Sequence, residues 1–363
     1  MKAPFVWFGG KRRVAPEVWA ALGDVPNYIE PFAGSLAVLL GRPHDMSNGT
    51  RRAETVNDAD GFLANFWRAL AHDPEAVAHW CDWPVNEVDL FARHLWLVNT
   101  GRSRLLEGME ADPDFYDAQV AGWWVWGVNA WIGSGWCSGD GPWVDTGDGI
   151  GKRPHLGNAG RGVNRKRPHL GDAGQGVNRQ LPHLGDAGQG VNRQRPHLGD
   201  AGRAGYNNME YRPNVLGYFE ELAGRLRDVR VCCGDWSRVC TSGAMSYGSK
   251  VGVFLDPPYL GDVRTADLYA VDDHTISHAV RDWCLEHGDD PRLRIVLAGY
   301  RAEHDDLMPD TWRRHYYSAS AAYSTTESAA RQDGNHANRA NEVLWFSPHC
   351  VTPDRQGELW EAL

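Results

Sequence analysis

The chain has 363 residues, of which 42% are hydrophobic and 23% are charged, and its formal net charge is −10. These values are ordinary for a soluble globular protein and allow one large domain or two moderate ones. No stretch approaches about 18 uninterrupted apolar residues, which argues against a membrane-spanning helix. The segment MKAPFVWFGGKRR at the beginning lacks the features of a signal peptide, and the seven cysteines have no metal-ligand spacing. We therefore expect a cytoplasmic protein with reduced thiols.

Strands and helices are predicted to alternate in the first part of the chain. NYIEPFAG (27–34) is predicted to be a strand that runs into a glycine turn, and SLAVLLG (35–41) to be an apolar helix. ETVNDAD (54–60) is predicted to be a second strand that ends in acidic residues. Residues 59–131 are predicted to be largely helical, because apolar residues recur there with helical spacing.

The alternation resumes after the middle of the chain. First we predict an amphipathic helix, VLGYFEELAGRLR (215–227), a strand with an acidic end, DVRVCCGDW (228–236), and a buried strand, KVGVFLDPPYLGD (250–262). A helix, HTISHAVRDWCLEHG (274–288), and another strand, LRIVLAGY (293–300), follow. WRRHYYSA (312–319) and ANEVLWFSP (340–348) are predicted to form a closing antiparallel pair. This alternation predicts an α/β open sheet with ligands at the carboxyl ends of its strands. Acidic residues stand at four of these ends and are expected to share one crevice: Glu30, Asp58, Asp235 and Asp256.

The fourth of these strands, over 251–255, stops abruptly at Asp256-Pro257-Pro258-Tyr259. Two consecutive prolines remove two backbone donors and fix φ, so no sheet ladder continues through them. The strand therefore ends on a carboxylate, a rigid pair of carbonyls and an aromatic ring. The alternative is a proline turn that only terminates the strand.

The segment 151–212 differs from the rest of the chain in charge. It holds eleven lysines and arginines against four acidic residues, a net charge of +7 within an acidic protein. Such a basic segment is typical of phosphate binding, although a solvated, disordered loop would have the same composition. Five arginines are the candidates for contacts with DNA phosphates: Arg153, Arg167, Arg179, Arg193 and Arg195.

The same segment is an internal repeat with a period of fourteen residues. KRPHLGNAGRGVNR, KRPHLGDAGQGVNR, QLPHLGDAGQGVNR and QRPHLGDAGRAGYN follow one another over 152–207. Leu or Val recurs at every seventh position, but each unit contains glycine and proline, which excludes a coiled coil. A stack of short turns fits the pattern better. The regularly spaced histidines also suggest a metal site, but repetition of a unit produces this regularity without any ligand role, and we expect no metal.

Six tryptophans are concentrated just before the repeats, over 123–143: Trp123, Trp124, Trp126, Trp131, Trp136 and Trp143. Most of them are expected to be core residues, since crowded aromatic side chains usually are. One or two near NAWIGSGWCSG (129–139) could instead stack on bases.

Five motifs in this order resemble a known family, the D12-class (α-group), Dam-like DNA adenine-N6 methyltransferases. They are FVWFGGK (5–11), YIEPFAG (28–34), VNDAD (56–60), CGDW (233–236) and DPPY (256–259). The resemblance implies a Rossmann-like methyltransferase fold, with a mixed seven-stranded sheet and helices on both faces. It also implies an inserted target-recognition region. The family often has a second glycine just after Phe-x-Gly, where this chain has Ser35-Leu36, so the path of that loop stays open.

The resemblance implies S-adenosylmethionine as the methyl donor and assigns roles to particular residues. Trp7, Lys11, Phe32, Gly34, Asp58, Asp235, Trp236 and Asp256 would bind the cofactor. Asp256, Pro257, Pro258 and Tyr259 would carry the chemistry on an adenine flipped out of the duplex. Other interpretations are a solvated charge for Lys11 and a helix N-cap for Asp58, with Asp60 competing for either role.

On this interpretation residues 1–60 and 213–350 form the catalytic domain, residues 61–212 form the DNA-binding region, and residues 351–363 are a tail. The expected activity is that of a site-specific, adenine-specific DNA methyltransferase (EC 2.1.1.72) acting on double-stranded DNA. We expect a monomer, with a cognate restriction endonuclease as a possible partner. The alternatives are an inactive DNA-binding protein that keeps the fold, an RNA adenine methyltransferase and a DNA cytosine-N4 methyltransferase. Asp256 favours adenine, because the cytosine enzymes more often have serine there.

Overall fold

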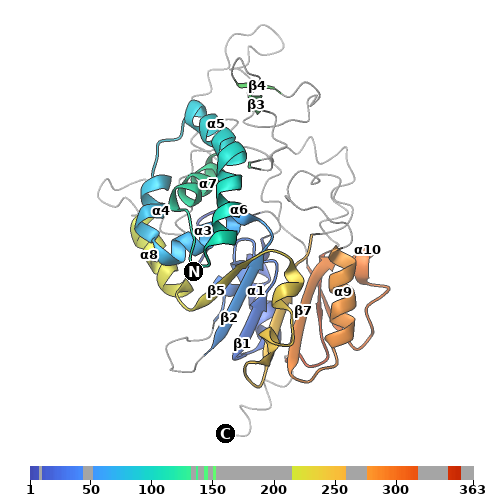
Figure 1. The fold of residues 1–363 in the computed structure, drawn as a ribbon. Coiled ribbons are helices and arrows are strands. Elements are labelled where there is room, and N and C mark those ends of the chain that lie inside the picture. The colour runs from blue at the N-terminus through green and yellow to red at the C-terminus, as the bar shows by residue number, and fades with distance from the viewer. Residues whose placement is uncertain are drawn as a thin grey trace, which may run out of the picture.

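The structure is a computed structural model that describes residues 1–7, 10–43, 52–131, 136–137, 143–145, 150–152, 215–258, 276–317 and 342–352. Its centre is a seven-stranded sheet in the order β5-β2-β1-β6-β7-β9-β8 (Figure 1). The strands are β1 (Asn27–Glu30), β2 (Ala53–Asp58), β5 (Val229–Cys233), β6 (Val251–Leu255), β7 (Leu293–Tyr300), β8 (Arg313–Tyr317) and β9 (Glu342–Phe346). The first five in the sheet order are parallel, and β9 runs antiparallel to both β7 and β8. This confirms the predicted mixed sheet and its closing antiparallel pair.

The central strands are buried on both sides, and their side chains alternate between two separate apolar clusters. Val253 and Leu255 of β6 belong to one cluster, whereas Phe254 belongs to the other. In β9 the same alternation places Trp345 in the first cluster and Phe346 in the second. Because successive side chains of a strand point to opposite faces, a continuous apolar run is what a strand covered on both faces requires.

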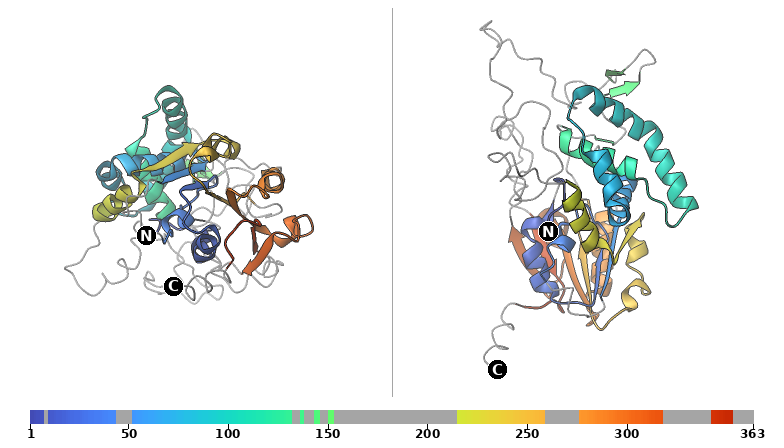
Figure 2. Two further views of the ribbon diagram at one scale, coloured as in Figure 1. Left: turned by 90° about the horizontal axis from the view of Figure 1, so that it is seen from below. Right: turned by 90° about the vertical axis from the view of Figure 1, so that its left-hand side faces the viewer.

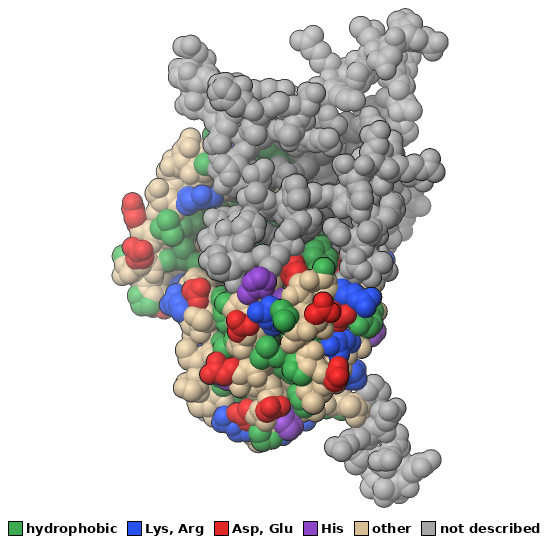
Figure 3. All heavy atoms as spheres, turned by 90° about the vertical axis from the view of Figure 1, so that its right-hand side faces the viewer, with side chains coloured by type: hydrophobic (Ala, Val, Ile, Leu, Met, Phe, Trp, Pro, Cys, Tyr) green, Lys and Arg blue, Asp and Glu red, His purple; other side chains and the backbone are tan. Residues whose placement is uncertain are grey.

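Helices cover both faces of the sheet. On one face lie α1 (Ala15–Leu22), α2 (Ala37–Leu40) and α3 (Gly61–His72), whose apolar residues share a cluster with Phe254. On the other face lies α9 (Ile276–His287), which contributes Val280 and Cys284 to the second cluster. The short helix α10 (Arg301–His304) follows β7 directly. Figure 3 looks onto the side that bears α9 and α10, where acidic and basic side chains of the described residues are interspersed.

The remaining described helices form a group at one end of the sheet, as Figure 1 and both views of Figure 2 show. They are α4 (Pro74–Cys81), α5 (Glu87–Trp96), α6 (Arg102–Ala111), α7 (Ala118–Ala130) and α8 (Val215–Leu226), with a π-helical turn, Leu97–Gly101, between α5 and α6. Helix α3 connects this group to the sheet, because it packs on β2 and β5 as well as on α7 and α8. Helices α3, α4, α5 and α7 are each capped by a residue whose side chain accepts from a backbone N–H of the first turn. These residues are, in the same order, Asp60, Asp73, Asn86 and Asp117.

The helical group confirms that most of the crowded tryptophans are core residues. Trp124, Trp126 and Trp131 are buried, and Trp136 donates its indole N–H to the carbonyl of Trp124 at 3.1 Å. The indole of Trp136 lies against Gly127 of α7, so closely that a Cβ on Gly127 would approach it to 1.8 Å. A glycine in the middle of α7 is therefore needed to seat Trp136.

Most of the segment after α7 lies outside the described residues. A short antiparallel pair, β3 (Trp143–Asp145) and β4 (Ile150–Lys152), precedes the repeats. The repeats beyond Lys152 lie outside the described residues, and so do the five arginines predicted to contact DNA. The domain boundaries predicted at residues 60 and 213 stay a prediction. Helix α8 was predicted to belong to the catalytic domain, and it packs against α3 and α4. In the part of the chain that the structure describes, no helix is long and apolar enough to span a membrane.

Replacing glycine by alanine at two helical positions should have opposite effects on stability. Gly224→Ala in α8 should raise the free energy of unfolding by about 0.5–1 kcal/mol, because nothing lies within 4 Å of the added methyl group. Gly127→Ala should lower it, because the methyl group displaces the Trp136 indole. Urea unfolding followed by circular dichroism measures both. A stabilising Gly127→Ala would contradict the packing of Trp136 on α7.

Candidate active site

The order of the strands creates a crevice where the chain changes direction across the sheet. From β1 the chain proceeds through β2 to β5 on one side, whereas β6 pairs with β1 on the other side and leads on to β7. In open α/β sheets, ligands bind outside the carboxyl ends of the strands at such a switch point. The strands that end in Asp58, Glu30 and Asp256 are neighbours, and β5, which precedes Asp235, lies beside β2. The four acidic strand ends thus lie along one edge.

The loop after β1 comes into direct contact with the beginning of the chain. Gly34 has a φ of +46°, and a Cβ on it would lie 2.8 Å from Cδ1 of Trp7. On its other side Gly34 accepts the indole N–H of Trp67 at 3.0 Å through its carbonyl oxygen. Only glycine leaves room for the Trp7 ring here and adopts this backbone conformation readily.

The departure from the family pattern at Ser35-Leu36 does not break the loop. Leu36 has a φ of 54° and a ψ of 27°, the left-handed conformation that glycine adopts most readily. Its side chain is fully buried in the cluster that also holds Val38 and Leu39. The chain therefore keeps the backbone turn that a second glycine would favour, and the burial of a leucine offsets the conformational cost of about 1–2 kcal/mol.

Asp58, at the end of β2, is tied to backbone groups on both sides. Its Oδ2 accepts from the N–H of Gly34 at 3.0 Å, and its Oδ1 accepts from the N–H of Asp60 at 2.9 Å. Asp60 is the residue that caps α3, through bonds to Phe62 and Leu63, so Asp58 does not serve as the cap. Burial raises the pKa of Asp58 to about 6, and the two backbone hydrogen bonds oppose this rise.

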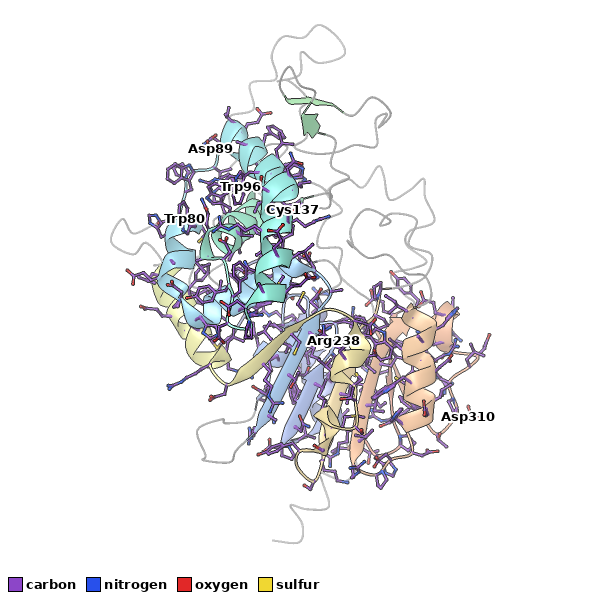
Figure 4. All side chains as sticks on the ribbon, in the orientation of Figure 1. Trp80, Asp89, Trp96, Cys137, Arg238 and Asp310 are labelled. Atoms are coloured by element: carbon purple, nitrogen blue, oxygen red, sulfur yellow. The ribbon has the colours of Figure 1, made fainter. Side chains whose placement is uncertain are left out.

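The end of β5 places an aromatic pair next to this loop. Trp236 stacks on Phe32 with ring centroids 6.1 Å apart and an interplanar angle of 27°. Asp235 caps the short 3-10 helix Trp236–Val239 by accepting from the N–H of Ser237, and its side chain is exposed. Arg238, labelled in Figure 4, donates to the carbonyl of Cys233 at 2.9 Å and fixes the turn. Phe32 and Trp236 are thus brought together from two loops, as the prediction of a shared pocket requires.

Lys11 and Asp256 form an ion pair at the end of β6. The distance between Nζ and Oδ1 is 3.0 Å, and the side chains are 5% and 19% exposed. Lys11 lies in a short 3-10 helix, Lys11–Arg13, that follows Trp7 closely, since Gly10 donates its N–H to the Trp7 carbonyl. Pro257 is buried and Pro258 half-buried, whereas Tyr259 lies outside the described residues. Lys11 and Asp256, two of the predicted site residues, are therefore in direct contact.

Glu30 is the least exposed of the four acidic strand ends. It is 2% exposed and accepts the hydroxyl of Tyr28 at 2.9 Å. Burial raises the pKa of Glu30 to about 8, and the nearby carboxylate of Asp256 contributes to the same direction. A carboxyl with this pKa is largely neutral at pH 7, and that of Glu30 lies buried at the end of β1.

Asn57, the polar residue beside Asp58, was not among the predicted site residues. It is 2% exposed, and its amide bridges the loops that follow β1 and β5. One signal in the sequence could have identified it: Asn57 is a polar residue within a predicted strand. A polar side chain that is buried in a strand must find hydrogen-bond partners. Among the described residues there is no group of three or more side chains suited to hold a metal ion.

Part of the chain matches a known protein family. Residues 7–85 match the family model of the D12 class N6 adenine-specific DNA methyltransferases. The match contains Trp7, Lys11, Phe32, Gly34 and Asp58, and with the seven-stranded sheet it confirms the Rossmann-like methyltransferase fold and the resemblance to Dam-like adenine methyltransferases. It supports DNA methyltransferase activity, and this family implies S-adenosylmethionine as the methyl donor. A search of curated proteins found no match to the chain.

Glu30→Gln should change the pH dependence of stability. The folded-state pKa of Glu30, about 8, is above its ordinary value of 4.5, so the native protein holds more protons than the unfolded chain between these values. Stability is therefore lost as pH rises through this window, and the neutral glutamine should remove the loss. The variant should gain about 1–3 kcal/mol over wild type between pH 5 and pH 9.

Thermal unfolding at several pH values measures this gain, with the exposed Glu221→Gln as the control that should show none. A constant difference between Glu30→Gln and wild type across the pH range would contradict the raised pKa.

Proposed function

We propose that the protein transfers a methyl group from S-adenosylmethionine to N6 of adenine in double-stranded DNA. The observation that carries the proposal is the Lys11–Asp256 contact at the switch point. It joins the segment that matches the adenine methyltransferase family to the Asp-Pro-Pro-Tyr tetrapeptide, which lies outside the match. A methyltransferase needs its cofactor residues and its target-base residues around one reacting centre, and the contact between Lys11 and Asp256 supports such an arrangement.

The residues around the β1 loop fit the proposed cofactor. Gly34 lets the Trp7 ring pack against the β1 loop, Asp58 offers a carboxylate to ribose hydroxyls, and Phe32 and Trp236 offer ring faces to an adenine. Lys11 has three N–H donors, so it can hold Asp256 and a cofactor carboxylate at once. When bound, S-adenosylmethionine supplies a methyl group activated by its sulfonium.

Asp256 and Pro257 would then activate the target amine. The amino nitrogen of adenine is a poor nucleophile because its lone pair is conjugated with the ring. Acceptors for its two hydrogens favour the tetrahedral nitrogen and stabilise the positive charge that develops on it. The carboxylate of Asp256 and the carbonyl of Pro257 are the proposed acceptors, and Lys11 orients the carboxylate at 3.0 Å. Tyr259 would stack on the flipped adenine.

The DNA-binding role of residues 61–212 is part of the same proposal. The support for it is the +7 net charge of 151–212 and the position of the helical group, which α3 connects to the sheet directly after the end of β2. Arg153, Arg167, Arg179, Arg193 and Arg195 would contact phosphates and thereby place the duplex over the crevice.

Asp256→Ala should abolish methyl transfer to duplex DNA while cofactor binding persists. The substitution removes an acceptor used mainly in the transition state, so kcat should fall by about a thousandfold or more. Transfer of a labelled methyl group measures the rate, and sequencing of modified bases in plasmid DNA from an expressing strain identifies the base. Asp310→Ala is the matched control, because Asp310 is fully exposed and distant from the crevice (Figure 4). Near wild-type kcat in Asp256→Ala would overturn the mechanism.

The affinity for S-adenosylmethionine should depend on the ionisation of Asp58. When pH falls through about 6, Asp58 becomes protonated and loses acceptor capacity, so the wild-type Kd should rise by about tenfold between pH 7.5 and pH 5. Asp58→Asn should bind weakly at both pH values and show a flat profile. Isothermal titration calorimetry measures both proteins. A wild-type Kd that is the same at both pH values would show that Asp58 does not hold the cofactor.

A further inference from the structure

Asn57 lies at a position from which its side chain reaches the loop after β1 and the turn after β5. It is the penultimate residue of β2, and β2 lies between β1 and β5 in the sheet. The loop after β1 carries Phe32 and Gly34, and the turn after β5 carries Trp236. Three loops therefore meet at the end of β2.

The hydrogen bonds of Asn57 tie these loops together. Its Nδ2 donates to the carbonyl of Pro31 at 3.0 Å and to the carbonyl of Gly234 at 2.9 Å. Its backbone carbonyl accepts from the N–H of Ala33 at 2.8 Å. The neighbouring Asp58 completes the arrangement, because its backbone carbonyl accepts from the N–H of Gly234 at 3.0 Å.

The two bridging bonds require an amide at this position. Both partners are carbonyl oxygens, so one atom must donate two hydrogens in different directions. A carboxylate has no hydrogen to donate, and a serine or threonine hydroxyl has one. Loss of the amide would also leave two carbonyl oxygens without these donors at a site that is only 2% exposed.

We propose that Asn57 is a positioning residue for the cofactor. By bridging Pro31 and Gly234 it sets the separation of the β1 loop and the β5 turn, and hence of Phe32 and Trp236, which project from them 6.1 Å apart. Asn57 itself touches no reacting atom. The inference rests on the function proposed above, because it concerns the pocket in which S-adenosylmethionine would bind.

Asn57→Ala should weaken cofactor binding without slowing the chemistry at saturation. We expect the Kd and the KM for S-adenosylmethionine to rise by about tenfold or more, the effect of losing two hydrogen bonds that preorganise the site. The kcat at saturating cofactor and DNA should stay within about threefold of wild type, since the acceptors at Asp256 are unchanged. Calorimetry and methyl-transfer kinetics measure the two effects separately.

A matched control is available in Asn65 of α3. It is also fully buried, and its side chain joins α3 to the start of α7 through bonds to the N–H and carbonyl of Asp117. Asn65→Ala should lower thermal stability as Asn57→Ala does, but it should leave the Kd for the cofactor unchanged. Equal losses of affinity in the two variants would assign the effect to stability and overturn the positioning role.

A spectroscopic measurement reports on the loops directly. In protein labelled with 5-fluorotryptophan, the ¹⁹F resonance of Trp236, assigned by its absence in Trp236→Phe, should shift in Asn57→Ala and stay unchanged in Asn65→Ala. Should Asn57→Ala fail to fold, Asn57→Ser, which keeps one donor, is measured in the same way and should show an intermediate loss of affinity.

The outcomes separate this proposal from the proposed function. If the wild-type protein does not bind S-adenosylmethionine, the function is wrong and the role of Asn57 falls with it. If wild type binds the cofactor and the Asn57 variant binds it equally tightly with an unmoved Trp236 resonance, the function stands and the positioning role is overturned.

Discussion

The parallel pairing of β1 with β6 is the constraint on which the site depends. It places Asp256 beside the loop that follows Glu30, although most of the chain, including the repeats, lies between them in sequence. The pairing is held by apolar side chains on both faces, such as Ile29 and Val253 in one cluster and Phe254 in the other. Because a shift of one residue would exchange the two faces, the burial pattern also fixes which residue stands at the strand end.

The polar groups at the crevice are costly to bury, and the structure compensates each of them locally. Asp58 accepts two backbone N–H groups, Asn57 donates to two carbonyls, and Lys11 pairs with Asp256. Glu30 is compensated least, and its pKa of about 8 reflects this. A preorganised site of this kind holds its donors and acceptors in place before a ligand arrives, which is where catalytic sites gain most of their electrostatic advantage.

Sequence patterns predicted the strands and the polar residues at their ends well. The clearest case is β6, a short apolar run that is followed directly by Asp256. They did not predict the π-helical turn Leu97–Gly101 or the β3–β4 pair, which have no such pattern. The path of the loop at Ser35-Leu36 was not predicted, because the left-handed conformation of Leu36 is stabilised by the burial of its side chain in the folded protein. The Lys11–Asp256 pair and the bridge made by Asn57 join segments distant in sequence, and only the assembled sheet brings them within reach. The roles assigned to these residues and to the repeat arginines stay predictions.

The family match and the ion pair support the assignment from independent directions. The match ends at residue 85, so by itself it concerns the β1 loop, β2 and the first helices. The tetrapeptide at 256–259 is short enough to occur by chance or as a simple strand terminus. The fold adds a geometric observation: β6 brings Asp256 to within 3.0 Å of Lys11, a residue inside the matched segment. Because the contact joins two motifs that are distant in sequence, it favours the proposed site over a proline turn that only ends the strand.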